Sequence, residues 1–278
     1  TSKLISRFDR LAGRRATWET HWQEVADYML PRKADITKRR SRGDKRMERI
    51  FDSSPLQALE LLASSLHGML TNPSTPWFTL RFKKLEDSND DEAKLWLEEA
   101  TEIMYTAFNR SNFQQEIFEL YHDLITFGTA AMFIEEDEDD LVRFSTRHID
   151  EIYVAENKKG TIDTIYRKFH MTSRALVQKF GDKVSQDIRT LATKNPYEEI
   201  DIIHVVYPRD EFNPKKKDKA NMPFESIYFE YKGGNELSVS GFKEFPFVVP
   251  RYLKASNEVY GRSPAMTALP DVKMLNEM

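Results

Sequence analysis

Residues 50–82, IFDSSPLQALELLASSLHGMLTNPSTPWFTLRF, contain the pattern that decides the fold. Asp52, Ser53 and Ser54 offer side-chain oxygens for a helix N-cap. Pro55 suits the first helical turn because its missing N–H would have no partner there. Seven apolar residues then recur at helical spacing: Leu56, Leu59, Leu62, Ala63, Leu66, Met69 and Leu70. Little charge stands opposite them, so the pattern predicts a buried helix.

The end of this stretch predicts a sharp corner. The helix is expected to end at 71–73, Thr-Asn-Pro, because the residue before a proline is disfavoured in the α region. Pro76 follows, and residues 77–82, WFTLRF, then alternate in the way that is typical of a β-strand. We therefore expect a core helix that leads into an aromatic strand.

A second helical face precedes this stretch. From Leu4 to Met29, residues recur at spacings of three and four, and all of them are apolar except Arg15. This predicts a long helix ending before Pro31, although Gly13 leaves open two shorter helices. Such a face packs on the core or on a neighbouring subunit. Three of its aromatic residues form our candidate subunit interface: Phe8, Trp18 and Trp22.

Residues 32–49, RKADITKRRSRGDKRMER, form a strongly basic segment that we call the basic arm. It holds nine basic and three acidic residues, a local charge of +6, in a chain whose formal net charge is −4. It is expected to be an exposed loop. It is either simply solvated or a contact for phosphate or an acidic partner. The candidate DNA or partner contacts are Lys38, Arg39, Arg40, Arg42, Lys45 and Arg46.

The remaining chain changes from helical to strand periodicity near residue 129. Two helices are expected at 97–108 and 113–127, with Ser111-Asn112 as the break and cap before the second helix and Gly128 closing it. After them, alternation predicts a hairpin at 130–147 whose tip is acidic. Further segments are expected as strands: 149–155, 161–169, 200–207, 224–231, 237–242 and an edge strand at 245–252. Short helical signals occur at 171–181 and after Ser263-Pro264.

The fold class is therefore α+β. A helical N-terminal half, 1–128, is expected to pack on a mostly antiparallel β-rich half, 129–260. Residues 261–278 begin a terminal helix that the natural protein is expected to continue.

Composition excludes several classes of protein. The chain has 278 residues, with 41 basic against 45 acidic, which argues against a generic nucleic-acid coat protein. It has no cysteine, so disulfides and thiolate metal sites are excluded. The sequence contains no apolar run of about 18 residues and no signal-peptide pattern at its start. We expect a soluble protein that is intracellular or particle-associated.

Catalytic motifs are absent from the sequence. There is no nucleotide-binding glycine loop, no nucleophile elbow and no HExxH pair, and the six histidines are scattered. The acidic run at 135–140 could hold Mg²⁺ or Ca²⁺, but a specific site needs carboxylates that converge from different elements. We therefore predict no cofactor, no metal site and no catalytic residues.

Five stretches in the same order resemble the portal, or head-to-tail connector, proteins of T7-like short-tailed bacteriophages. They are RFDRLAGRRATWETHWQEVADYMLPRK (7–33), FDSSPLQALELLASSLHGMLTNPSTPWF (51–78), FGTAAMFIEEDED (127–139), YVAENKKGTIDTIYRKFHMTSRALVQKFG (153–181) and VYGRSPAMTALPDVKMLNEM (259–278). The resemblance implies a wing-forming N-terminal portion of a longer protein. Most of the stem, the clip and the crown would follow Met278.

The resemblance also implies a function and a set of partners. About twelve copies would form a closed ring at one capsid vertex, through which double-stranded DNA is packaged and ejected. Implied partners are the major capsid and scaffold proteins, the terminase large subunit and a tail adaptor, with no membrane. The ATPase belongs to terminase, so no enzyme activity is expected here. Implied locations are the portal vertex of the virion and the host cytoplasm during assembly.

Two other hypotheses remain open at this point. A metal-dependent nucleic-acid-processing enzyme could use carboxylates such as Asp137, Asp139 or Asp150, and it would require Mg²⁺. A DNA-binding module could act through the basic arm, and its affinity would fall steeply with salt. The absence of a second carboxylate or histidine cluster at ligand spacing favours the conduit over the enzyme.

Overall fold

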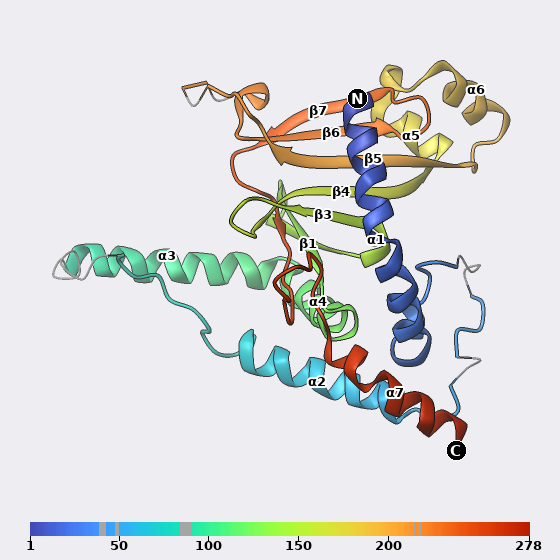
Figure 1. Ribbon diagram of the computed structural model, residues 1–278. Coiled ribbons are helices and arrows are strands. Elements are labelled where there is room, and N and C mark those ends of the chain that lie inside the picture. The colour runs from blue at the N-terminus through green and yellow to red at the C-terminus, as the bar shows by residue number, and fades with distance from the viewer. Residues whose placement is uncertain (39–42, 48–49, 84–90, 214, 217) are drawn as a thin grey trace. The chain divides into compact units, whose positions relative to one another are not determined.

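The computed structural model describes residues 1–38, 43–47, 50–83, 91–213, 215–216 and 218–278 (Figure 1). Its compact units do not follow contiguous halves of the chain. The first unit contains 1–21, 148–246 and 257–259, and the second contains 22–147, 247–256 and 260–278. Helix α1 (Ser2–Met29) contributes to both units. These compact units do not coincide with the division that we expected, which is 1–128, 129–260 and 261–278. That division stays a prediction.

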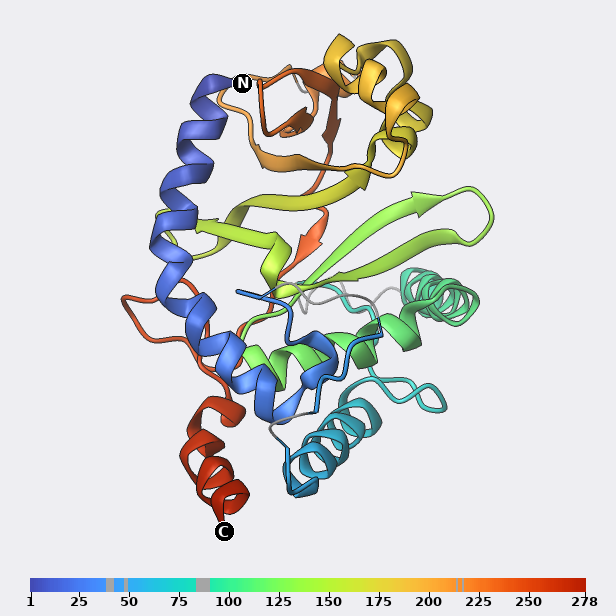
Figure 2. The same ribbon diagram turned by 90° about the vertical axis from the view of Figure 1, so that its right-hand side faces the viewer.

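The first unit is built on a five-stranded antiparallel sheet (Figure 2). Each strand is followed in the sheet by the next strand of the chain, in the order β3-β4-β5-β6-β7. The strands are β3 (Ile152–Glu156), β4 (Ile162–Thr172), β5 (Glu199–Pro208), β6 (Phe224–Glu230) and β7 (Glu236–Phe242). Every neighbouring pair is antiparallel, which confirms the predicted topology class.

Helices cover both faces of this sheet because its strands alternate. Ile203 belongs to a buried cluster with Phe8 of α1, whereas its neighbour Ile202 belongs to a second cluster with Leu176 of α5. Successive strand residues point to opposite faces, so one strand serves both clusters. The helices on the second face are α5 (Ser173–Phe180) and α6 (Gln186–Lys194), which the short 3₁₀ helix η4 (Gly181–Lys183) connects. The first unit also contains the 3₁₀ helices η3 (Ile149–Glu151) and η5 (Lys219–Asn221).

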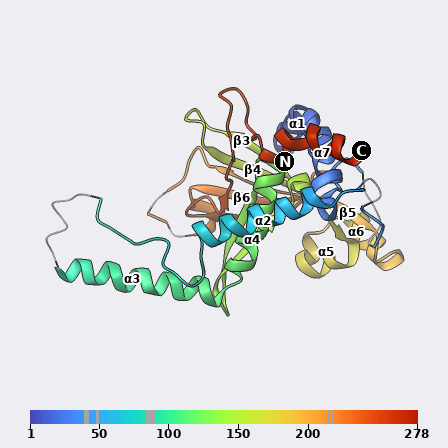
Figure 3. The same cartoon turned by 90° about the horizontal axis from the view of Figure 1, so that it is seen from below.

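The second unit combines helices with a small sheet. Its strands are β1 (Ala131–Asp137), β2 (Leu141–Arg147) and β8 (Phe247–Val248), in the order β2-β1-β8. Its helices are α2 (Ser54–Leu70), α3 (Asp91–Arg110), α4 (Phe113–Phe127) and α7 (Pro264–Glu277), with the short turn η1 (Pro31–Lys33). Figure 3 shows α3 reaching away from α2 and α4. The β1–β2 hairpin is confirmed, with Ala131 opposite Arg147.

Two glycines bring separate parts of the second unit together. Gly128 ends α4 with φ +74, a left-handed conformation that glycine adopts easily. Its backbone lies against Gly261, so a Cβ added to either glycine would overlap the other's backbone. The Gly261 N–H also donates to Thr129 Oγ1 at 2.8 Å. This close approach fixes the start of α7, whose N-cap Ser263 accepts from the Met266 N–H at 3.0 Å.

Three local expectations are wrong. Residues 77–82 are not a strand: the Trp77 and Phe78 N–H groups each donate to the Tyr105 hydroxyl at 2.6 Å, so α3 side chains replace a ladder. The edge strand predicted at 245–252 is only the two-residue strand β8. Beyond it, Arg251 and Leu253 form isolated β-bridges. Of the pair Ser111-Asn112, Asn112 does not cap α4 through its side chain, which instead exchanges hydrogen bonds of 2.8 and 3.0 Å with the Phe144 backbone. The Ser111 hydroxyl accepts from the Phe113 N–H at 3.3 Å.

Two further differences concern helices. Gly13 does not divide α1, which is continuous. Helix α2 exists as predicted, but its apolar face is not fully buried: Leu59 and Ala63 are covered, while Met69 is 81% and Leu70 53% exposed. The fold class itself is confirmed as α+β with antiparallel sheets and a final helix.

Candidate functional site: the basic arm, the acidic hairpin tip and the uncovered helices

The base of the basic arm is anchored on α4 by ion pairs. Lys33 Nζ lies 2.6 Å from Glu119 Oε1 and 2.5 Å from Asp123 Oδ1, and Asp123 is fully buried. Arg32 pairs with the same Glu119 at 3.1 Å. Burial raises the pKa of Glu119, but the charges of Lys33 and Arg32 outweigh it and hold that pKa below its usual value. The first residues of the arm are therefore fixed structure.

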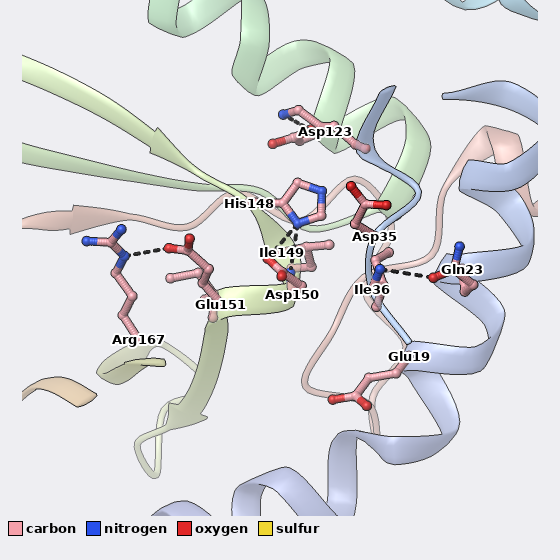
Figure 4. A network of polar contacts seen from close by, with 12 residues as sticks. Glu19, Gln23, Asp35, Ile36, Asp123, His148, Ile149, Asp150, Glu151 and Arg167 are labelled. Atoms are coloured by element: carbon pink, nitrogen blue, oxygen red, sulfur yellow. Dashed lines mark hydrogen bonds and ion pairs between the residues drawn. The ribbon is translucent and has the colours of Figure 1, made fainter. Parts of the chain in front are cut away.

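Gln23 of α1 fixes the next residues of the arm. Its Oε1 accepts from the Ile36 and Thr37 N–H groups at 2.9 and 2.8 Å, as Figure 4 shows for Ile36. Its Nε2 donates to the Ala34 carbonyl at 2.6 Å. One buried glutamine thus replaces the regular backbone partners that this irregular segment lacks.

The six candidate contact residues of the arm have different surroundings. Arg46 pairs with Asp35 at 2.5 Å and donates to the Arg32 carbonyl, so it holds the arm together. Lys38 and Lys45 are exposed. The other three, Arg39, Arg40 and Arg42, lie outside the described residues. The arm as a DNA or partner contact stays a prediction.

The acidic tip of the β1–β2 hairpin has a defined shape. Asp137 Oδ1 accepts from the N–H groups of Asp139 and Asp140, both at 3.0 Å. These hydrogen bonds stabilise the carboxylate and lower the pKa of Asp137. Leu141 closes the turn with φ +69. The remaining acidic side chains of the tip are exposed: Glu135, Glu136, Glu138, Asp139 and Asp140.

The carboxylates of the enzyme hypothesis do not form a metal centre. Asp137 and Asp139 share the hairpin tip, whereas Asp150 lies in η3 with its Oδ1 2.6 Å from His148 Nδ1 (Figure 4). Across the residues that the structure describes, no group of three or more His, Asp or Glu side chains is placed to hold a metal ion. Asp150 thus orients His148 within the first unit.

Two further histidines, His122 and His204, are buried in separate packed surroundings. His122 is 1% exposed, and burial lowers its pKa even though Glu60 lies 3.3 Å away. His204 stacks on the Tyr228 ring with a centroid distance of 3.9 Å and lies 2.9 Å from the Ser226 hydroxyl. These contacts are those of structural histidines in packed cores.

The candidate subunit interface on α1 divides into buried and partly exposed residues. Phe8 is 2% exposed and packs edge-on against Tyr153 at 4.7 Å. Trp22 is completely buried, and its Nε1 donates to the Phe127 carbonyl at 3.1 Å. These two residues leave almost no surface for another subunit. Trp18 is partly exposed, so the predicted interface rests on Trp18 among the three.

Apolar surface is instead exposed on α2 and α3. On α2, Leu61, Leu62 and Met69 face solvent without a charged residue among them. On α3, Trp96 is 65% and Ile103 67% exposed. Apolar patches of this kind on a helix commonly mark association surfaces. The helical spacing of apolar residues on α2 could have suggested this surface, but the same spacing is also typical of a buried helix.

In the described part of the chain, no helix is long and apolar enough to cross a membrane.

Comparisons with known proteins agree on one family. The family described as "Bacteriophage head to tail connecting protein" matches residues 1–278. The chain is 35% identical over 278 residues to "Probable portal protein" of Bordetella phage BPP-1, and 34% identical over 279 residues to "Portal protein" of Salmonella phage epsilon15. Each match covers 98% of this chain and 50% of the relative, so the chain spans about half the length of the curated relatives it matches. The chain belongs to the bacteriophage head-to-tail connecting protein family.

Proposed function

We propose that this chain is part of a phage portal protein, which forms a ring-shaped conduit at one vertex of the capsid. Double-stranded DNA enters the capsid through the ring during packaging and leaves through it at ejection. The observation that carries this proposal is the match to two portal proteins along 98% of the chain. In this proposal the ring contains about twelve copies, joined by two different patches on each subunit.

The surface of the chain supports an assembled state. A helix such as α2, with little charge and a solvent-facing row of Leu61, Leu62 and Met69, exposes apolar area that association would cover. The cost of leaving that area in water favours a partner subunit. Residues 1–128 and 129–260 would form the wing of the portal, and 261–278 would begin its stem.

The remaining partners belong to the same proposal. The ring would contact the major capsid and scaffold proteins, the terminase large subunit and a tail adaptor. The basic arm is the candidate contact for DNA or one of these partners, through its exposed Lys38 and Lys45. The protein would act without catalysis of its own, at the portal vertex of the virion and, during assembly, in the host cytoplasm.

The assembly mass of the full-length protein tests this function. Native mass spectrometry with negative-stain images is expected to give a closed ring of about twelve subunits with a central hole. A full-length protein that stays a monodisperse monomer at micromolar concentration would contradict the proposal. Cleavage of DNA that requires Mg²⁺ and is lost in Asp137→Asn would favour the enzyme instead.

A further inference from the structure

Helix α1 carries a row of basic side chains on its exposed face. The row, which we call the basic stripe, consists of Lys3, Arg7, Arg10 and Arg14. Their spacing of four, three and four residues places them on one side of a helix, over a length of about 16 Å. Phe8, on a different side of the same helix, packs on the five-stranded sheet and fixes the orientation of α1 there.

The basic stripe has no acidic partner in the part of the chain that the structure describes. All four of its side chains are exposed, and none is within ion-pair distance of a carboxylate there. The contrast with Arg15 is clear, because Arg15 is 2% exposed and pairs with Glu19 at 2.7 Å. The basic arm also differs, since its Arg32 and Arg46 already pair with Glu119 and Asp35.

The acidic hairpin tip is a matching feature of opposite charge. Five of its carboxylates are exposed, and none of these five pairs with a cation within the described residues. The sixth is Asp137, whose Oδ2 lies 4.0 Å from Arg143 Nη1. Its Oδ1 accepts from the Asp139 N–H and so stabilises the turn. The tip contains six residues, 135–140, and extends about 10 Å. It is therefore shorter than the basic stripe and can lie along it.

A closed ring requires each subunit to carry two different, complementary patches. Resting on the proposed function, we propose that the basic stripe of one subunit docks on the acidic hairpin tip of the next. The occupant is a second copy of this chain because one chain supplies both halves of the match. On a rigid helix it supplies four cations that have no carboxylate partner among the described residues, and on a turn of fixed shape it supplies five exposed carboxylates.

The physical role of this contact is to set the register between subunits. Exposed ion pairs are individually weak and are screened by salt, whereas complementary patches accelerate encounter and exclude wrong orientations. Ring formation is therefore expected to require about tenfold more protein at 0.5 M salt than at 0.05 M salt.

Charge reversal in the full-length protein tests the contact. One variant carries Arg7→Glu and Arg10→Glu in the stripe, and the other carries Glu136→Lys and Glu138→Lys at the tip. Each variant alone places like charges across the contact, so each is expected to lose the ring. An equimolar mixture offers an acidic stripe to a basic tip and a native stripe to a native tip, so the mixture is expected to recover a ring of alternating subunits.

A matched control changes the same amount of charge in the same unit. Lys158→Glu with Lys159→Glu alters two exposed lysines of the turn between β3 and β4 and is expected to leave the ring intact. Circular dichroism and a thermal unfolding curve establish that each variant is folded. Native mass spectrometry with one variant isotopically labelled reads the composition of the mixed ring.

Three results would overturn the contact. Both variants could form rings as readily as the control. The mixture could fail to recover a ring that a single chain with all four changes does form, which would place the pairing within one chain. The stripe variant could form normal rings and lose only salt-dependent binding of DNA, which would make DNA the partner.

If the unmodified protein forms no ring, the proposed function fails instead, and this failure is distinguishable from the others.

Discussion

The Arg15 guanidinium donates from Nη1 to the Ile149 carbonyl at 2.9 Å, and so joins α1 to the turn before β3. The same group donates to the carbonyls of Asp150 and Ile152, at 2.7 and 2.5 Å, and lies 3.6 Å from the centre of the Tyr153 ring. The charged Arg15 thus stands among the apolar residues of the buried side of α1 because three backbone carbonyls need a donor there.

Replacing Arg15 by Met should strongly destabilise the first unit, which contains the five-stranded sheet. The substitution keeps the volume of the stem but leaves the three carbonyls with one partner fewer each, at about 1 kcal/mol or more per group. We expect a loss of about 3 kcal/mol in the free energy of unfolding, measured in urea. The control is Arg14→Met at the exposed neighbour, which should change it by less than about 0.5 kcal/mol. Equal effects of the two substitutions would show that the carbonyl contacts contribute little.

The position of Arg15 illustrates what the sequence can and cannot predict. The spacing from Leu4 to Met29 predicts a long helix, which is observed, and Arg15 is buried on the same side as the apolar residues of that pattern. The partners of Arg15 are more than 130 residues away, at Ile149 and Ile152. No local pattern connects such positions. The contacts of Gln23 span only 11 to 14 residues, but they join a helix to an irregular segment, where no periodic pattern exists to predict them.

Errors at the surface have a different cause. The residues of 77–82 alternate like a strand, but the Tyr105 and Thr101 hydroxyls of α3 satisfy the backbone there, so no neighbouring strand is needed. The apolar face of α2 predicts burial, but in the single chain Met69 and Leu70 of that face are exposed. Helical periodicity indicates that one face of a helix is buried in the assembled protein. It does not indicate whether that face packs on the same chain or on another subunit.

Substitutions at two glycines should have opposite signs. In Gly261→Ala, the added Cβ overlaps the Gly128 carbonyl, and because the obstacle is backbone it cannot turn aside. We expect a loss of about 2 kcal/mol or more. In Gly13→Ala, the added Cβ meets nothing within 4 Å on an exposed turn of α1, so a gain of about 0.5–1 kcal/mol is expected from helix propensity. Thermal unfolding midpoints of the two variants compare them directly, and a lower midpoint for Gly13→Ala would argue against a continuous α1.

The anchor of the basic arm should depend on pH. The pKa of Glu119 is held below its usual value by Lys33 and Arg32, so its stabilising contribution is complete above the unfolded-state pKa, near 4.5. It is lost as pH falls through the lower folded-state value. Lys33→Met removes the cation and leaves Asp123 buried without it. We expect a cost of about 3 kcal/mol at pH 7, which becomes smaller as the pH falls and Glu119 is protonated.

Urea unfolding at pH 7 and at pH 3.5 measures this dependence. Lys38→Met serves as the control because Lys38 is exposed in the same arm. It should cost less than about 0.5 kcal/mol at both pH values. A cost of Lys33→Met that is the same at pH 3.5 as at pH 7 would mean that packing of the lysine stem, and not its charge, stabilises the arm.

The uncovered face of α2 should matter for assembly and not for folding of the single chain. Leu61→Lys and Met69→Lys place charge where the chain itself makes little contact, since these side chains are 70% and 81% exposed. Their effect on the unfolding free energy of the chain should stay within about 0.5 kcal/mol, while the ring of the full-length protein is lost. Leu59→Ala is the opposite case, because Leu59 is 6% exposed and its truncation should cost about 2–5 kcal/mol in the chain itself. Unfolding curves and native mass spectra of the same three variants separate the two effects, and intact rings in both lysine variants would remove α2 from the subunit interface.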